Sequence, residues 1–251
     1  MSIEIILMLF VAGFVAGGVN AIAGGATLLT FPVLMAAGLP PTVANASNFV
    51  AILPGNAAAI PAYARELGDN RQEALRLVLF SLAGGAIGSV LLIYSTDSFF
   101  LKLVPWLILL ATLFYAFGGK LNQWASAKFG GKAIAAGLPG YLLMFLFSIY
   151  GGYFGAGLGV ITLAVLKIMG YLDFHQANAF KNLTNTVVSV LGVFLFAFSG
   201  LISWPEALVM MVGATAGGYG SARFARRIPQ KLLNSAVITL GFLLSIYYFV
   251  K

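Results

Sequence analysis

Two stripes of asparagine, one in each half of the chain, are the residues whose type and spacing could do chemistry. The first stripe holds Asn45 and Asn48, three positions apart. The second stripe has spacings that put its members on one helical face: Asn178, Lys181, Asn182 and Asn185. Amides donate hydrogen bonds without adding charge, and a lysine attracts anions. The stripes predict a site for a small anion; the other interpretations are interhelical hydrogen bonding by the asparagines and snorkelling of Lys181 to the membrane interface.

Each stripe follows a glycine-rich break in an apolar stretch. The residues at the two breaks that we expect to contact an anion are Gly24, Gly25, Ala26 and Thr27 in the first half, and Gly157 and Gly159 in the second. The first amides of a helix lack intrahelical partners and lie at the positive end of its dipole. A bound oxyanion would satisfy them, and glycine would let it approach the backbone. The same glycines also suit close helix packing.

Other kinds of site have few residues to work with. The chain has no cysteine and one histidine, His175, which we interpret as a loop or capping residue, so no metal, cofactor or catalytic site is predicted. All acidic residues fall at the ends of apolar segments or in loops. With no carboxylate inside a membrane segment to carry a proton or sodium, the pattern favours an anionic substrate and leaves any coupling ion unidentified.

The elements that position these residues are membrane helices. The chain is 61% hydrophobic and 8% charged, against roughly a quarter charged in soluble domains. Its apolar runs are about 20 residues long without two-residue alternation, which predicts an all-α, polytopic membrane protein rather than strands. The first ten residues read as the start of a membrane helix, not as a cleaved signal peptide. The predicted segments are 3–22, 26–38, 42–64, 74–94, 99–118, 133–150, 156–169, 175–199, 205–223 and 231–250.

The two halves repeat each other. The triplet Ala44–Asn45–Ala46 matches Ala177–Asn178–Ala179, and Asn48 matches Asn182 after a one-residue gap. Further matches, in the same order, are Gly17–Gly18 with Gly151–Gly152 and Ala83–Gly84–Gly85 with Ala216–Gly217–Gly218. We therefore expect a first transmembrane repeat over 1–119, a basic linker over 120–132 and a second repeat over 133–251. Glycines along the intact helices are expected to serve packing: Gly84, Gly85, Gly88, Gly213, Gly217 and Gly218.

Charge predicts the orientation. Most of the 14 lysines and arginines fall in three stretches, 65–76, 120–132 and 223–231, which the positive-inside rule places in the cytoplasm. Both termini then face outside, and the halves form an inverted 5+5 repeat. This holds if the two short segments cross the membrane, or if each folds back as a re-entrant hairpin with its predecessor. It fails if the first two segments together make a single crossing. Inverted repeats with broken helices are a plan used by secondary transporters.

The two broken stretches resemble the signatures of the sulfite exporter TauE/SafE family, also called the toluene sulfonate uptake permease family. In the first stretch the resemblance rests on Gly24–Gly25, Phe31–Pro32 and Gly38–Leu39–Pro40, followed by the residues from Ala44 to Asn48. In the second it rests on the run from Gly151 to Asn185. It extends over nearly the whole chain and implies a bacterial inner-membrane protein that moves sulfite, sulfonates or related organosulfur anions. The first turn departs from the family pattern at Ala26–Thr27, where many members carry more glycine.

These observations predict a transporter of small oxyanions, with sulfite or a small organosulfonate as the substrate and the lipid bilayer as the surroundings. No nucleic-acid partner is expected, because the basic residues lie in loops between membrane segments. Glycine- and alanine-rich helix faces suit pairing into a homodimer. Two alternatives stay open: a membrane subunit or assembly factor without transport activity, and a cation-coupled carrier of another solute.

Overall fold

The structure, a computed structural model, describes residues 1–23, 25–58, 60–129, 137–224 and 230–250, and all its elements in these ranges are helical. The helices are α1 (Ile3–Ala23), α2 (Ala26–Ala36), α3 (Pro41–Ala57), η1 (Ile60–Tyr63), α4 (Ala64–Asp69), α5 (Arg71–Ile93), α6 (Asp97–Phe129), α7 (Leu138–Tyr153), α8 (Leu158–Ile168), α9 (Phe174–Phe198), α10 (Trp204–Phe224) and α11 (Gln230–Val250). Segments of α1, α5, α6 and α9 are long and apolar enough to cross a membrane. The shorter apolar helices are α2, α7, α8 and the Ser235–Val250 part of α11. The predicted class, a helical membrane protein, is confirmed.

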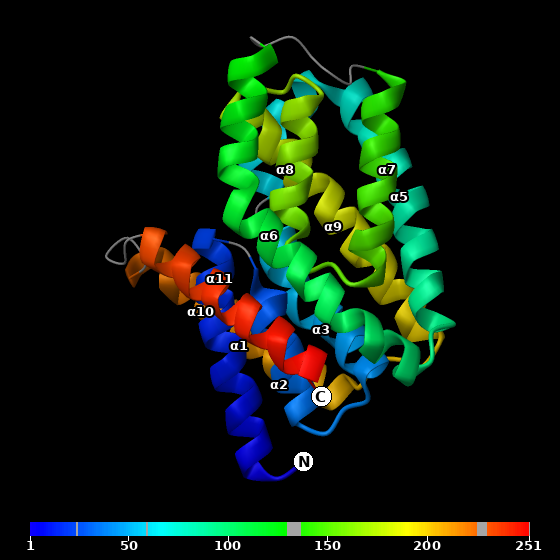
Figure 1. Ribbon diagram of the computed structural model, residues 1–251, viewed down its shortest axis with the longest axis vertical. Coiled ribbons are helices and arrows are strands. Elements are labelled where there is room, and N and C mark those ends of the chain that lie inside the picture. The colour runs from blue at the N-terminus through cyan, green and yellow to red at the C-terminus, as the bar shows by residue number, and fades with distance from the viewer. Residues whose placement is uncertain (24, 59, 130–136, 225–229, 251) are drawn as a thin grey trace.

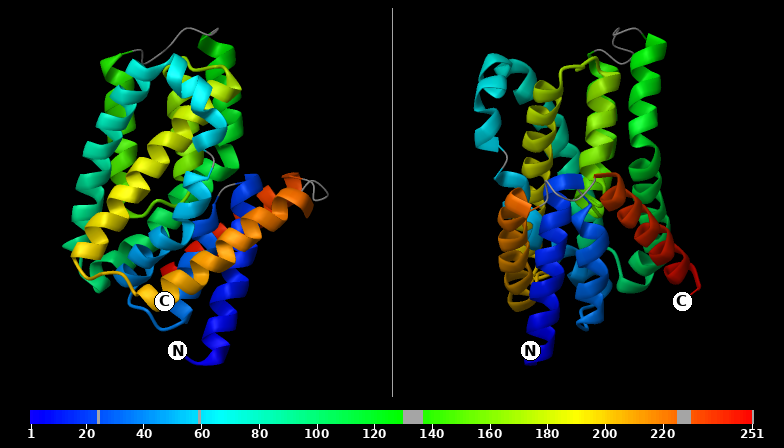
Figure 2. Two further views of the ribbon diagram at one scale, coloured as in Figure 1. Left: turned by 180° about the vertical axis from the view of Figure 1, so that it is seen from behind. Right: turned by 90° about the vertical axis from the view of Figure 1, so that its left-hand side faces the viewer.

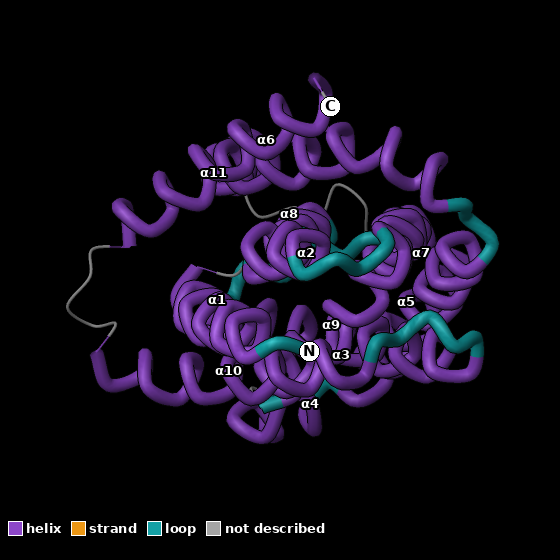
Figure 3. Tube along the Cα trace, turned by 90° about the horizontal axis from the view of Figure 1, so that it is seen from below, coloured by secondary structure: helices purple, strands orange, loops and turns teal. Residues whose placement is uncertain are grey.

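The helices form layers around two short central ones. Seen from below, α6 and α11 form one outer layer, while α10, α3, α9 and α5 lie on the opposite side (Figure 3). Between these layers lie α1 and α7, with α2 and α8 at the centre. Both chain termini lie at the same end of the molecule (Figures 1 and 2). The short helices are therefore surrounded by longer ones.

Left-handed glycines explain why α2 and α8 are short. Gly25 and Gly157 precede the two helices with φ of 83° and 70°, and Gly38 and Gly170 follow them with φ of 97° and 101°. At the C-terminal end of α2 the amide of Leu39 donates to the carbonyl of Leu34, which is the hydrogen bond typical of a helix that ends at a left-handed glycine. Only glycine adopts these angles without strain, so each helix is limited to 11 residues.

The packing of the two halves corresponds. Helix α1 packs against α10 as α7 packs against α5, and α3 contacts α10 as α9 contacts α5. Backbones touch in both pairs: a Cβ added to Gly217 would lie 1.8 Å from the carbonyl oxygen of Phe14, and one added to Gly88 would lie 2.0 Å from that of Ile149. The expected packing role is therefore seen at these glycines. Gly218 differs, because a Cβ added there would lie 3.7 Å from its nearest neighbour, the carbonyl oxygen of Gly17.

Two stretches that were predicted to lie between membrane segments are helical in the structure. Helix α6 continues to Phe129, so the first part of the predicted linker 120–132 is helical, and 130–132 lie outside the described residues. The charged stretch 65–76 contains α4 and the first turn of α5. Gly118 and Gly119 stand at the predicted segment end, but helix α6 runs through both, because helix propensity is a weak local preference that the surrounding residues override.

Aromatic side chains fill the larger of two buried clusters. Phe31 of α2 meets the rings of Phe100 and Phe154 edge to face, with centroids 6.2 and 5.5 Å away. The second cluster includes Leu77 and Phe180. The first cluster lies on the side of α2, and the second joins α5, α7, α8 and α9.

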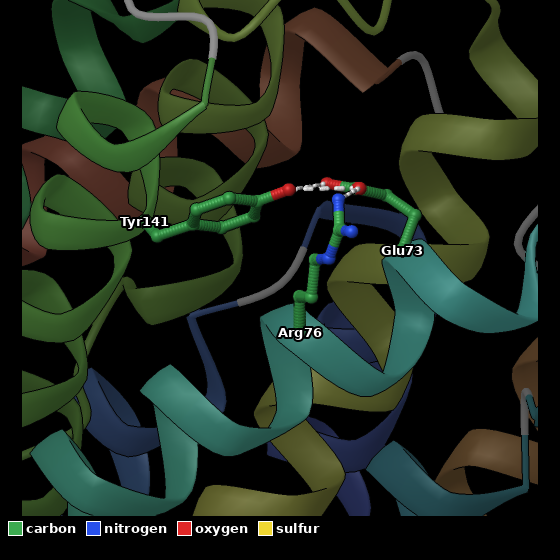
Figure 4. Close-up of polar contacts among 3 residues, drawn as sticks. All are labelled: Glu73, Arg76 and Tyr141. Atoms are coloured by element: carbon green, nitrogen blue, oxygen red, sulfur yellow. Dashed lines mark hydrogen bonds and ion pairs between the residues drawn. The ribbon is translucent and has the colours of Figure 1, made fainter.

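A polar cluster joins α5 to α7 at their first turns (Figure 4). The hydroxyl of Tyr141 donates to the Glu73 carboxylate, with both oxygens 2.8 Å away, and the Arg76 guanidinium lies 3.8 Å from one of them. Burial, followed by hydrogen bonding to Glu73, raises the pKa of the nearby Tyr171 hydroxyl, so this phenol stays protonated at neutral pH. The cluster stabilises the contact between the two helices.

We expect Tyr141→Phe to lower the free energy of unfolding by about 1.5–3 kcal/mol, because it removes a hydrogen bond to a charged group. Thermal unfolding of the purified protein in detergent measures this. Tyr94→Phe is the control, since Tyr94 is 84% exposed. Equal unfolding temperatures for the two variants would show that the Tyr141 hydroxyl adds no stability.

Candidate functional site

The two short helices point their first turns at one cavity. Figure 1 shows α8 above α2, and the view along the perpendicular direction in Figure 3 shows the two overlapping, so they lie nearly end to end. Residues from both starts line a single cavity of about 830 Å³, among them Gly25, Ala26 and Thr27 from α2 and Gly157 and Gly159 from α8. Gly24 lies outside the described residues. The expected convergence of the two breaks is therefore present.

The amides at these starts lie where the hydrogen bonds of their helices begin. In the first turns, the amide of Leu28 donates to the Gly25 carbonyl at 3.1 Å, and those of Val160 and Ile161 donate to the Gly157 carbonyl. The amides of Ala26, Thr27 and Gly159 have no carbonyl in their own helices to donate to. Two positive helix ends thus face the same space, which is an arrangement suited to a negative charge.

We expect Gly157→Ala to destabilise the protein by about 1–2 kcal/mol, because an L-residue is strained at this left-handed angle. The new methyl group would also come within 3.3 Å of Ala111. Thermal unfolding measures the loss. Gly68→Ala in α4 is the control, since nothing lies within 4 Å of its added methyl group. A Gly157→Ala variant that unfolds at the control temperature would show that the break tolerates other backbone angles.

The second asparagine stripe lines the cavity along α9. Its members there are Asn178, Lys181, Asn182 and Asn185. The ammonium of Lys181 donates to the side-chain oxygen of Asn178 at 3.0 Å, which holds the lysine against the wall. The hydroxyl of Thr162 donates to the side-chain oxygen of Asn185 at 2.9 Å. The side-chain nitrogen of Asn185 lies beside the start of α8. A Cβ added to Gly159 would be 3.5 Å from this nitrogen.

The first asparagine stripe is buried next to the cavity rather than lining it. The amide nitrogen of Asn48 donates to the hydroxyl of Thr27 at 3.2 Å, and its oxygen accepts a short hydrogen bond from Thr30. Asn45 donates to the carbonyl of Tyr153 at 2.8 Å. Both asparagines have no exposed surface. Asn48 thus supports the cavity-lining Thr27 from behind, and a direct role in binding for either residue stays a prediction.

Thr30 and Thr162 occupy equivalent places, each five residues after the left-handed glycine of its short helix. Because Thr30 bonds to Asn48 and Thr162 bonds to Asn185, the structure pairs Asn48 with Asn185 in this contact. The sequence match had paired Asn48 with Asn182. The register of α9 against α8 therefore differs by one helical turn from that of α3 against α2.

Several polar residues of the lining lie outside the predicted site. They are Asn20, Asn56, Tyr63, Ser189, Thr215 and Tyr219. Asn56 donates to the hydroxyl of Ser189 at 3.4 Å, which connects α3 to α9 across the cavity. One signal was available for Asn20: after Glu4 it is the only other polar side chain in α1, and such residues in membrane helices face the protein interior.

The cavity carries positive charge. Among the described lining residues Lys181 is the one basic side chain, and no carboxylate is among them. In the described part of the chain, Lys181 makes no ion pair. The same ranges contain no group of three or more histidine, cysteine or acidic residues that could hold a metal. The charge and donors match a small anion.

The cavity opens at one end and is closed at the other. The exposed residues of its lining are Gly55, Ala58, Thr215 and Tyr219, which lie in the second halves of α3 and α10 or directly after α3. The two helices lead into the basic stretches 65–76 and 223–231. The other end of the cavity is lined by buried residues of α3, including Phe49 and Ala51.

Comparison with known proteins finds relatives that match nearly the whole chain. The profile of the family described as sulfite exporter TauE/SafE matches residues 9–248. A "Probable membrane transporter protein" of Haemophilus influenzae is 30% identical, over 97% of this chain and 94% of its own. "Probable membrane transporter protein ORF9" of a Sinorhizobium species is 29% identical over 98% and 93%. "Probable membrane transporter protein YfcA" of Escherichia coli K12 is 27% identical over 95% and 87%. No solved structure matches the chain.

Proposed function

Because the chain belongs to the sulfite exporter TauE/SafE family, we propose that it is a membrane transporter of a small sulfur oxyanion, either sulfite or a small organosulfonate. The solute crosses the bacterial inner membrane without chemical change. The observation that carries the proposal is the meeting of two helix starts and Lys181 in one cavity. Helix N-termini directed at an anionic group from broken helices are a recurring transporter site.

The chemistry of the lining supports an anion over a cation. The amides of Ala26, Thr27 and Gly159 are donors, and the side-chain amides of Asn182 and Asn185 add further donors. Lys181 supplies the full positive charge. A cation would meet two positive helix ends and a lysine without a carboxylate among the described lining residues, so its binding would be opposed.

The arrangement of the helices supports an inverted repeat. In Figure 1, α1 and α3 run away from the end that carries the termini, whereas their equivalents α7 and α9 run toward it. Equivalent helices thus cross the molecule in opposite directions. With the basic stretches in the cytoplasm, both termini lie outside and the cavity opens inward. A homodimer remains a prediction.

The test is transport by the purified protein in liposomes. We expect saturable uptake of radiolabelled sulfite or methanesulfonate that protein-free liposomes lack. Choline, a cation that does not cross the bilayer by itself, serves as the cationic control, and the proposal predicts no uptake of it through the protein. Neither binding nor flux of sulfite or any small sulfonate would refute the anion assignment.

A further inference from the structure

The buried end of the cavity is formed by Phe49 of α3, which is 3% exposed. Its ring meets Phe196 of α9 edge to face, with centroids 5.3 Å apart. The same ring covers Gly192, where an added Cβ would lie 3.0 Å from it, and Gly155 just before α8, where the distance would be 3.3 Å. Phe49 thus fills the space between α3, α9 and the second glycine break.

Asn45 lies one helical turn beyond Phe49, toward the end of the molecule that carries the termini. Its amide nitrogen donates to the Tyr153 carbonyl at 2.8 Å, but its side-chain oxygen has no hydrogen-bond partner in the described part of the chain. The residue has no exposed surface. A fully buried acceptor without a partner is costly and needs a reason, such as a second state that hydrates or binds it.

The equivalent residues in the other half face the open end of the cavity. Asn178, which matches Asn45 within the Ala–Asn–Ala triplet, lines the cavity beside Lys181. Gly218, which matches Gly85, also lines the cavity. At Gly85 the side chain of Val188 fills the corresponding space, 3.2 Å from where a Cβ would be. At matching positions of the two halves, Asn178 and Gly218 therefore line the cavity, whereas Asn45 and Gly85 are covered by neighbouring residues.

We propose that Phe49 is the gate that closes the solute path toward the end carrying the termini, and that Asn45 is the first solute-binding residue beyond it. Opening separates α3 from Tyr153, which frees the Asn45 amide nitrogen to donate to the anion and lets its oxygen reach water. The inference rests on the proposed function for the identity of the solute. The gate itself can be tested without transport.

The chain has no cysteine, so a single introduced thiol reports accessibility without background. With purified protein and a charged methanethiosulfonate, Thr215→Cys at the open end should react readily, and Asn45→Cys should react slowly. Adding Phe49→Ala to Asn45→Cys should raise the rate of modification at least about tenfold, because the gate is removed. The matched control adds Phe180→Ala, which truncates an equally buried ring in the other core cluster. It should leave the rate of Asn45→Cys modification low.

A second variant tests the gate if the Phe49→Ala protein does not fold. Gly192→Ala adds one methyl group under the Phe49 ring and should also speed modification of Asn45→Cys, by less than Phe49→Ala. If folded variants with Phe49→Ala or Gly192→Ala leave the thiol as slow as before, or if Phe180→Ala speeds it equally, the gate is refuted. If the gate variants expose the thiol but no sulfur oxyanion is transported, the gate stands and the substrate assignment fails.

Discussion

Replacing Lys181 with glutamine is expected to weaken binding of methanesulfonate roughly 10- to 100-fold, the largest effect predicted for any single cavity residue. A hydrogen bond to a charged group contributes about 1.5–3 kcal/mol, and glutamine keeps a donor while losing the charge. The lysine is half-buried, makes no ion pair among the described residues, and is held by Asn178 at 3.0 Å. Its charge is therefore available to a ligand.

Isothermal titration calorimetry on the purified protein measures the change in Kd. Lys167→Gln is the matched control: Lys167 lies in the last turn of α8 and does not line the cavity. The control should bind methanesulfonate as the unmodified protein does. An unchanged Kd for Lys181→Gln would mean that the lysine serves the membrane interface or the fold, and that the helix ends bind without it.

Gly217→Ala is expected to lower the free energy of unfolding by about 1–3 kcal/mol or more, as overpacking of a buried contact does. The added methyl group would lie 1.8 Å from the carbonyl oxygen of Phe14. A backbone atom cannot move aside as a side-chain end can, so α1 and α10 must separate. The loss should exceed the gain of about 0.5–1 kcal/mol that alanine brings to a helix in place of glycine.

Gly220→Ala, on the same helix, provides the control with the opposite sign. Its methyl group would find the Phe14 ring at 3.9 Å, which is an ordinary contact. This variant should be as stable as the unmodified protein or slightly more so. Thermal unfolding of both in the same detergent decides the matter, and equal stabilities would show that the α1–α10 contact is looser than the structure has it.

Local signals in the sequence were enough for the helices and for part of the cavity lining. Glycines that favour left-handed angles and prolines that stop helices are read directly from the chain, so α2 and α8 and their breaks could be predicted. The α9 stripe could be predicted too, because Asn178 and Lys181 share one helical face whatever surrounds the helix. The linker was harder, since α6 continues to Phe129 through Gly118 and Gly119, a pair that locally disfavours helix but does not end it here.

Other parts of the site depend on distances between helices. Asn20, Asn56 and Ser189 are far apart in sequence and meet only because α1, α3 and α9 surround the same space. Asn48 has the residue type of a ligand-binding group, but it is used to hold Thr27 and Thr30. Gly218 resembles its packed neighbour Gly217, yet it lines the cavity. No local pattern separates these cases.

The sequence by itself determined that this protein is a bundle of membrane helices with two glycine-broken segments, because apolar run length, glycine angles and helical spacing act within a few neighbouring residues. Only the tertiary structure decided that both breaks share one cavity, that Lys181 enters it and that Asn45 does not. Those outcomes depend on how α3 and α9 pack across the molecule, where a ring such as Phe49 or a missing side chain at Gly218 closes or opens the space between helices.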